Sequence, residues 1–93
     1  MGIRLVVAMD AAPGKREELK AGFASLCPSV LEEPGCEQYE LFQSIENPDR
    51  LVLLEQWTDQ DALQIHGQRL RERRGLDMAS LRDGPVRVER YDV

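Results

Sequence analysis

The sequence predicts an α+β fold with its elements in the order strand, helix, strand, strand, helix, strand. Four runs are rich in apolar and β-branched residues, as strands are. Two longer runs repeat apolar residues every three or four positions, as helices do. With 93 residues and 42% hydrophobic composition, the chain has the size of one domain with one core, so residues 1–93 are expected to form a single domain.

The first strand is predicted at residues 3–9, and the first helix follows it. Pro13 suits the first turn of a helix, where its missing N–H is not needed. From residue 17 onward, apolar side chains recur at steps of four, three and four, which places them on one side of an amphipathic helix: Leu19, Phe23, Leu26 and Val30. Pro28 interrupts the helical pattern, so we expect a kink or short break beside it.

Two further strands, residues 36–45 and 51–57, are predicted to form a hairpin. The Pro-Gly pair before the first of them ends the helix, and the Glu-Asn-Pro-Asp-Arg segment between them is rich in turn-forming residues. The second helical region begins at residues 58–59, where Thr and Asp can each cap it. Gly67 and Gly75 are expected to divide that region, whose second segment ends near Leu81.

A turn at residues 83–85 then leads into the last strand, which completes the order of a ferredoxin-like βαββαβ sandwich. In the third strand, Leu51 and Leu53 point one way while Val52 and Leu54 point the other. Both faces of the antiparallel sheet therefore need cover, although the helices of this topology lie on one face. We expect a homodimer in which the sheet pairs with that of a second subunit.

Composition and charge exclude several classes of protein. A net charge of -5 disfavours nucleic-acid binding, which depends on a basic surface. The apolar run near the start is too short for a signal peptide or a membrane span, so a cytoplasmic protein with no membrane partner is expected. Two cysteines and one histidine cannot make a four-ligand zinc site, and nucleotide-binding glycine motifs are absent, so no metal and no cofactor are expected.

Three segments carry a family resemblance: Pro-Gly-Lys after the first strand, EPGCEQYEL at residues 33–41, and LLEQWTDQDALQIH at residues 53–66. In combination they resemble the antibiotic biosynthesis monooxygenase (ABM) domain family of the dimeric α/β-barrel superfamily, over residues 3–91. The resemblance implies a ferredoxin-like fold, a dimeric α/β barrel, and a cavity between sheet and helices in each subunit. It also implies diverse chemistry, from cofactor-independent oxidation of polycyclic phenols to haem cleavage and isomerisation.

Three side chains are candidate catalytic residues. His66 is the only histidine, it can remove a proton near neutral pH, and it matches the histidine of the family pattern. Trp57 can form a flat wall with a free indole N–H, and Tyr39 can donate from its hydroxyl. The alternatives are structural: His66 packing a helix on the sheet, Trp57 filling the end of the barrel, and Tyr39 facing the partner subunit.

Four more residues are candidates for substrate binding. Met9 and Met78 are adaptable apolar side chains that suit a cavity wall or the core. Glu55 shares a strand face with Trp57, as a buried acid or as part of an interface ion pair. Arg73, from an arginine-rich stretch, can hold an anionic or carbonyl-bearing substrate or lie on a solvated helix face.

The function expected from these residues is a cofactor-independent monooxygenase that oxidises a small aromatic or phenolic substrate with O2 to a quinone. Two alternatives stay open at this point. One is a dimeric small-ligand-binding or stress-related module without turnover, since one convincing acid-base residue is present. The other is an isomerase of small carbonyl compounds, with the arginines as its substrate clamp.

Overall fold

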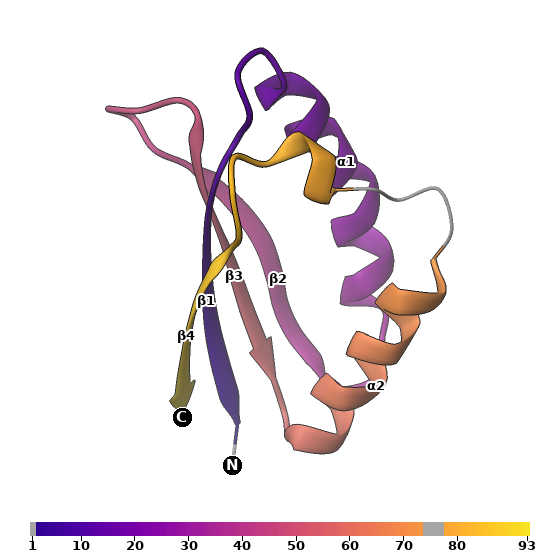
Figure 1. The fold of residues 1–93 in the computed structure, drawn as a ribbon. Coiled ribbons are helices and arrows are strands. Elements are labelled where there is room, and N and C mark those ends of the chain that lie inside the picture. The colour runs from indigo at the N-terminus through magenta and orange to yellow at the C-terminus, as the bar shows by residue number, and fades with distance from the viewer. Residues whose placement is uncertain (1, 74–77) are drawn as a thin grey trace.

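A computed structural model describes residues 2–73 and 78–93. They form, in order, β1 (Ile3–Asp10), α1 (Arg16–Leu31), β2 (Cys36–Gln43), β3 (Arg50–Trp57), α2 (Gln60–Glu72), the 3-10 helix η1 (Ala79–Leu81) and β4 (Arg87–Asp92) (Figure 1). The strands make one antiparallel sheet in the order β2-β3-β1-β4. This is the ferredoxin-like α+β fold that the sequence predicts.

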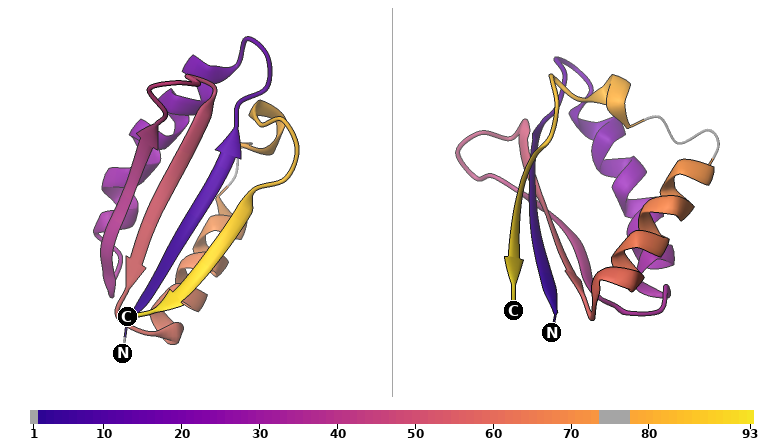
Figure 2. Two further views of the ribbon diagram at one scale, coloured as in Figure 1. Left: turned by 90° about the vertical axis from the view of Figure 1, so that its left-hand side faces the viewer. Right: turned by 60° about the horizontal axis from the view of Figure 1, so that its bottom comes forward.

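The helices lie on one face of the sheet and leave the other face without a helix. In the left view of Figure 2 they lie behind the sheet, whose near face is bare. Along β3, Leu51 and Leu53 are buried toward the helices, whereas Val52 and Leu54 alternate with them and are half-buried. The prediction that both faces of this strand are apolar is therefore confirmed.

The core forms where α1 packs on the sheet. The four residues of the predicted apolar stripe are all buried: Leu19, Phe23, Leu26 and Val30. They contact the buried side chains of β1 and β3, among which Trp57 is fully buried and Met9 nearly so. Burial of these large side chains is the main favourable contribution to folding.

Neither Pro28 nor Gly67 breaks the helix in which it lies. Pro28 lies inside an unbroken α1, and because Ala24 and Pro28 are exposed, water can bond the carbonyl that proline cannot. The helix α2 runs through Gly67 without a break, since a single glycine costs about 1 kcal/mol rather than ending a helix. Gly75, the other predicted breaking point, lies outside the described residues.

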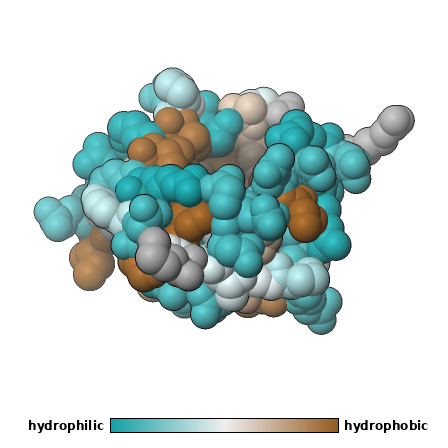
Figure 3. Space-filling view, turned by 90° about the horizontal axis from the view of Figure 1, so that it is seen from below, coloured by the Kyte–Doolittle hydropathy of each residue, from teal (hydrophilic) through white to brown (hydrophobic). Residues whose placement is uncertain are grey.

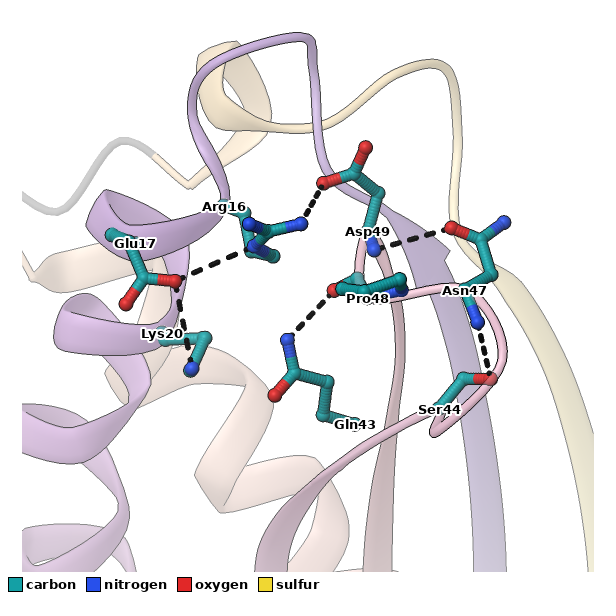
Figure 4. Close-up of polar contacts among 8 residues, drawn as sticks. All are labelled: Arg16, Glu17, Lys20, Gln43, Ser44, Asn47, Pro48 and Asp49. Carbon is teal, nitrogen blue, oxygen red and sulfur yellow. Dashed lines mark hydrogen bonds and ion pairs between the residues drawn. The ribbon is translucent and has the colours of Figure 1, made fainter.

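The turn between β2 and β3 begins earlier than predicted, because Ser44 leaves the strand to bond the turn. The Ser44 hydroxyl accepts from the backbone N–H of Asn47 at 3.1 Å, and the Asn47 side chain accepts from that of Asp49 at 3.2 Å (Figure 4). Arg16, at the start of α1, pairs with Asp49 at 3.1 Å. The turn is thus tied both to itself and to α1.

The surface is mainly hydrophilic at the end of the molecule where the chain termini lie. Figure 3 shows this end, with hydrophobic side chains in separate patches among hydrophilic ones. Within the described residues, no helix combines the length and the apolar character needed to cross a membrane.

Gly35, at the junction of α1 and β2, brings this junction close to the start of α2. Its φ of 85° lies in the left-handed region, which glycine adopts without strain. A Cβ at this position would lie 2.5 Å from the Cβ of Ala62 and 2.8 Å from the hydroxyl of Thr58. The glycine is therefore required both by the backbone and by the contact between two elements.

Replacement of Gly35 by alanine tests this double requirement. We expect Gly35→Ala to lose about 1–2 kcal/mol for the left-handed backbone and a further ~1–3 kcal/mol for the contact with α2. Gly14→Ala is the matched control, because Gly14 has a φ of 77° but nothing within 4 Å of its Cβ position. Urea unfolding of both variants gives the difference, and equal losses would show that the contact with α2 contributes nothing.

Candidate functional site

A cavity of about 570 Å³ lies between the helix-covered face of the sheet and the layer formed by α1, α2 and η1. Its walls are mainly apolar, with side chains from both layers: Val7, Met9, Phe23, Leu26, Leu53 and Met78. Four polar side chains also line it, namely Tyr39, Glu55, Arg71 and Arg82. An apolar cavity with a few convergent polar groups is the usual form of a small-molecule site.

Glu55 is the one acidic residue among the described residues of this cavity wall. It is 7% exposed, and one of its carboxylate oxygens accepts a hydrogen bond from the Trp57 indole at 3.0 Å. Burial raises the pKa of Glu55, while the Trp57 hydrogen bond and the nearby His66 act against that rise. A carboxylate with a raised pKa holds a proton more strongly than a solvated one, as a general base must.

Tyr39 lines the same cavity from β2, where it is paired with Glu55 on the neighbouring strand β3. Burial, with the charge of Glu55 second, raises the pKa of its hydroxyl. The tyrosine therefore stays protonated and can donate a hydrogen bond to a ligand anion. Its side chain does not face away from the cavity toward the bare side of the sheet.

His66 pairs with a residue that the sequence did not single out, Glu33. Both are buried, at 3% and 8% exposure, and the His66 Nδ1 lies 3.1 Å from a Glu33 carboxylate oxygen. Because a carboxylate only accepts, Nδ1 carries the proton, and Nε2 has no hydrogen-bond partner among the described residues. The imidazole lies against Trp57, with centroids 4.6 Å apart, and edge-on to Tyr39 at 5.3 Å.

Two arginines in the last turn of α2 and just after it lie close to Glu33. Arg73 lies 3.9 Å and Arg69 4.0 Å from the Glu33 carboxylate oxygens. They offset the charge of a carboxylate that is almost removed from water. Glu33 lies in the Glu-Pro-Gly segment just after α1, which the sequence pattern indicated as a helix end. Nothing in the neighbouring sequence indicates that its partner is His66.

The predicted site residues divide into two groups. Four of them line the cavity between the sheet and the helices: Tyr39, Glu55, Met9 and Met78. The other predicted residues are not among the described lining residues: His66, Trp57 and Arg73. His66 contacts the lining residue Tyr39, Trp57 donates to the lining residue Glu55, and Arg73 pairs with Glu33.

Arg71 and Arg82 are cavity residues that sequence reasoning missed. Arg71 belongs to the arginine-rich stretch, but its helical position alone does not separate it from its neighbours. Arg82 precedes the turn to β4 and carries no motif.

A second hollow, of about 760 Å³, runs along α1 and the edge strand β2. Phe23, Cys27, Leu31 and Leu41 contribute to its apolar walls. It shares Tyr39 and Phe23 with the first cavity, but neither Glu55 nor the two arginines are among its described lining residues. Among the described residues, no three His, Cys, Asp or Glu side chains gather so that they could hold a metal ion.

Residues 2–71 match the family model described as antibiotic biosynthesis monooxygenase. YcnE of Bacillus subtilis, a candidate monooxygenase by its name, is 36% identical over 66 residues, which cover 71% of this chain and 70% of YcnE. A conserved protein of Methanosarcina mazei has a similar structure, with a TM-score of 0.88, 30% identity and coverage of 98% of this chain and 91% of that one. A candidate antibiotic biosynthesis monooxygenase of Caulobacter crescentus has a TM-score of 0.82, 28% identity and coverage of 99% and 89%.

The raised pKa of Glu55 makes stability depend on pH. The unfolded chain releases this proton near the usual value of 4.5, whereas the folded chain retains it to higher pH. The folded state binds more protons in that interval, so its stability falls as pH rises from about 4.5 through the raised pKa. As pH rises through this interval, the free energy of unfolding should fall less for Glu55→Gln than for the wild type. Urea unfolding at successive pH values measures this difference. Glu37→Gln, at an exposed site on β2, is the control, and parallel curves for wild type and Glu55→Gln would contradict the assignment.

Proposed function

Because this chain belongs to the antibiotic biosynthesis monooxygenase family, we propose that its cavity oxidises a small phenolic molecule with O2 to a quinone, without a bound cofactor. The observation that carries the proposal is Glu55, a buried carboxyl with a raised pKa on the wall of a mainly apolar cavity. The apolar walls can pack against an aromatic ring, and the Glu55 carboxyl can hydrogen-bond to a hydroxyl on that ring. The quinone-forming reaction is one of several chemistries that the family resemblance implies.

In the proposed reaction, the Glu55 carboxylate takes the proton of the phenol. The resulting anion is stabilised by a hydrogen bond from the Tyr39 hydroxyl in surroundings with little water. The electron-rich anion transfers one electron to O2, and the two radicals combine to a hydroperoxide on the ring. Loss of water from this hydroperoxide leaves a carbonyl on the ring. One oxygen atom of O2 therefore enters the quinone. The other leaves as water, together with the phenolic hydrogen and one ring hydrogen.

Glu55 thus takes the role of base that the sequence pattern suggested for His66. Trp57 donates to Glu55 rather than to the substrate, and so orients the carboxylate. His66, held by Glu33, packs against both aromatic rings and supports their positions. In this proposal His66 and Trp57 are positioning residues, and Glu55 and Tyr39 are the catalytic ones.

We also propose that the bare face of the sheet pairs with a second copy of the chain. This face carries half-buried Val6, Val52 and Leu54. Phe42 and Tyr91 also lie on it and are 45% and 50% exposed. The same face also carries polar residues such as Arg4, Glu40 and Gln56, and exposed apolar patches with a polar surround mark interaction sites.

Oxygen consumption tests the proposed reaction. With dihydroxynaphthalenes and anthrones as substrates, we expect uptake of O2 with formation of quinone by the metal-stripped protein. Glu55→Gln should lower kcat by about 10²–10⁴-fold, because it removes general-base catalysis, while Glu37→Gln should leave it unchanged. His66→Ala should have a smaller effect than Glu55→Gln.

Three results would contradict parts of this proposal. If O2 uptake is unaffected by Glu55→Gln, Glu55 is not the base. If His66→Ala lowers O2 uptake more than Glu55→Gln does, His66 is the base. No uptake with any substrate, combined with thermal stabilisation by one of them, would favour a binding module without turnover.

Charge placed on the bare face tests the dimer. We expect sedimentation equilibrium to give the mass of two chains for the wild type and of one chain for Leu54→Lys, because removing a lysine charge from water in an interface is costly. In the monomer the new lysine lies opposite Glu40 across the sheet, so the fold should tolerate it. Gln64→Lys, on the exposed side of α2, should remain dimeric. A monomeric wild type would contradict the proposal.

A further inference from the structure

We propose that the ligand of this cavity carries a carboxylate, which binds to Arg71 and Arg82. The inference rests on the proposed function, because it assigns a substrate class to the same cavity. The ligand is then an aromatic carboxylate with a hydroxyl group, and the arginines bind the end away from that hydroxyl.

The first observation is that these two arginines lack the partners that the other described arginines have. Five others pair with carboxylates, and Arg4 and Arg90 bond to side-chain amides: the five are Arg16, Arg50, Arg69, Arg73 and Arg87. Within residues 2–73 and 78–93, neither Arg71 nor Arg82 has an ion pair or a side-chain hydrogen bond. Both line the same cavity. In an acidic chain, two unpaired arginines on one cavity wall point to an anion supplied from outside.

The second observation is that one donor of Arg82 is sealed from water. Its Nε is buried and has no hydrogen-bond partner. A guanidinium N–H that has lost its water without gaining an acceptor is energetically unfavourable. Because Nε is out of reach, the terminal nitrogens of Arg82 are the donors that a carboxylate in the cavity can contact, and arginine binds carboxylates well through such paired donors.

The backbone holds Arg82 in place over the cavity. Arg82 forms an isolated antiparallel bridge with Ala11, just beyond the end of β1. On its two sides, the N–H of Ala12 donates to the carbonyl of Leu81 at 2.8 Å, and the N–H of Asp83 donates to that of Asp10 at 2.7 Å. The guanidinium is thus attached to a backbone segment that is fixed to the sheet, as a binding group should be.

The positions of the polar groups along β1 indicate the shape of the ligand. Glu55 pairs with Leu5, whereas Arg82 is bridged to Ala11, six residues further along the chain. At about 3.3 Å per residue, their backbones are ~20 Å apart along the strand, and both residues line the cavity. A ligand that contacts both ends is therefore elongated, with at least two fused rings.

Binding of a matched pair of probes tests the inference. The probes are 6-hydroxy-2-naphthoate and its methyl ester, which differ in charge but little in size, and isothermal titration without O2 separates binding from turnover. We expect the acid to bind about tenfold or more tightly than the ester, because charge-assisted hydrogen bonds are the stronger ones. Arg82→Met should abolish this preference, Arg71→Met should reduce it, and Arg82→Lys should retain part of it.

Arg87→Met is the control, because Arg87 is an exposed arginine that pairs with Asp10 outside the cavity. It should keep the full preference for the acid. Equal affinity of acid and ester in the wild type would overturn the inference, as would an unchanged preference in the Arg71→Met, Arg82→Met double variant. If Arg82→Met fails to fold by circular dichroism, Arg71→Met and Arg82→Lys decide between the same two outcomes.

Failure of this inference and failure of the proposed oxygenase are distinguishable. An ester that binds as well as the acid and is oxidised overturns the carboxylate subsite and supports the oxygenase. A preference for the acid that depends on Arg82, without O2 uptake, supports the subsite and contradicts the oxygenase. Absence of binding by both probes at millimolar concentration overturns both.

Discussion

The contact between Glu33 and His66 is the interaction on which the site depends. It joins the end of α1 to the middle of α2, 33 residues apart, through a 3.1 Å hydrogen bond between buried groups. Gly35 makes this contact possible, because a side chain there would push α2 away. With α2 held in this position, the imidazole packs against Trp57 and Tyr39, and α2 covers the sheet above the cavity. A buried polar pair of this kind specifies one arrangement of the elements, since any other leaves its groups unpaired.

From this contact a series of polar side chains leads to the cavity wall. His66 packs on Trp57, the Trp57 indole donates to Glu55, and Glu55 lines the cavity. Each group is buried, and each restricts the geometry of the next. The carboxyl at the end of the series has a raised pKa because burial outweighs the hydrogen bond from Trp57. The proposed base is therefore a consequence of packing, and its orientation is a consequence of the histidine behind it.

The distribution of charge gives the cavity a sign opposite to that of the chain. The net charge is -5, yet the charged residues on the described part of the cavity wall are one carboxyl and two arginines. Elsewhere in the described chain the arginines are matched by carboxylates or amides, as in the contacts of Asp10 with Arg50 and Arg87. A small acidic protein can in this way repel anions in general and still bind one in a place shielded from solvent.

The sequence by itself determined the order of the elements, the apolar stripe of α1 and the alternation along β3, because these follow from local periodicity. Alternation also placed Glu55 on the same strand face as Trp57, but only the tertiary structure decided that this face, and Tyr39 on β2, lie toward the helices. Only the tertiary structure decided that Glu33 is the partner of His66, that Arg71 and Arg82 line the cavity while Arg73 faces Glu33, and that α1 and α2 continue through Pro28 and Gly67. These depend on how distant segments approach one another and on which backbone groups reach water. Periodicity reports the face on which a side chain lies, but not what packs against that face.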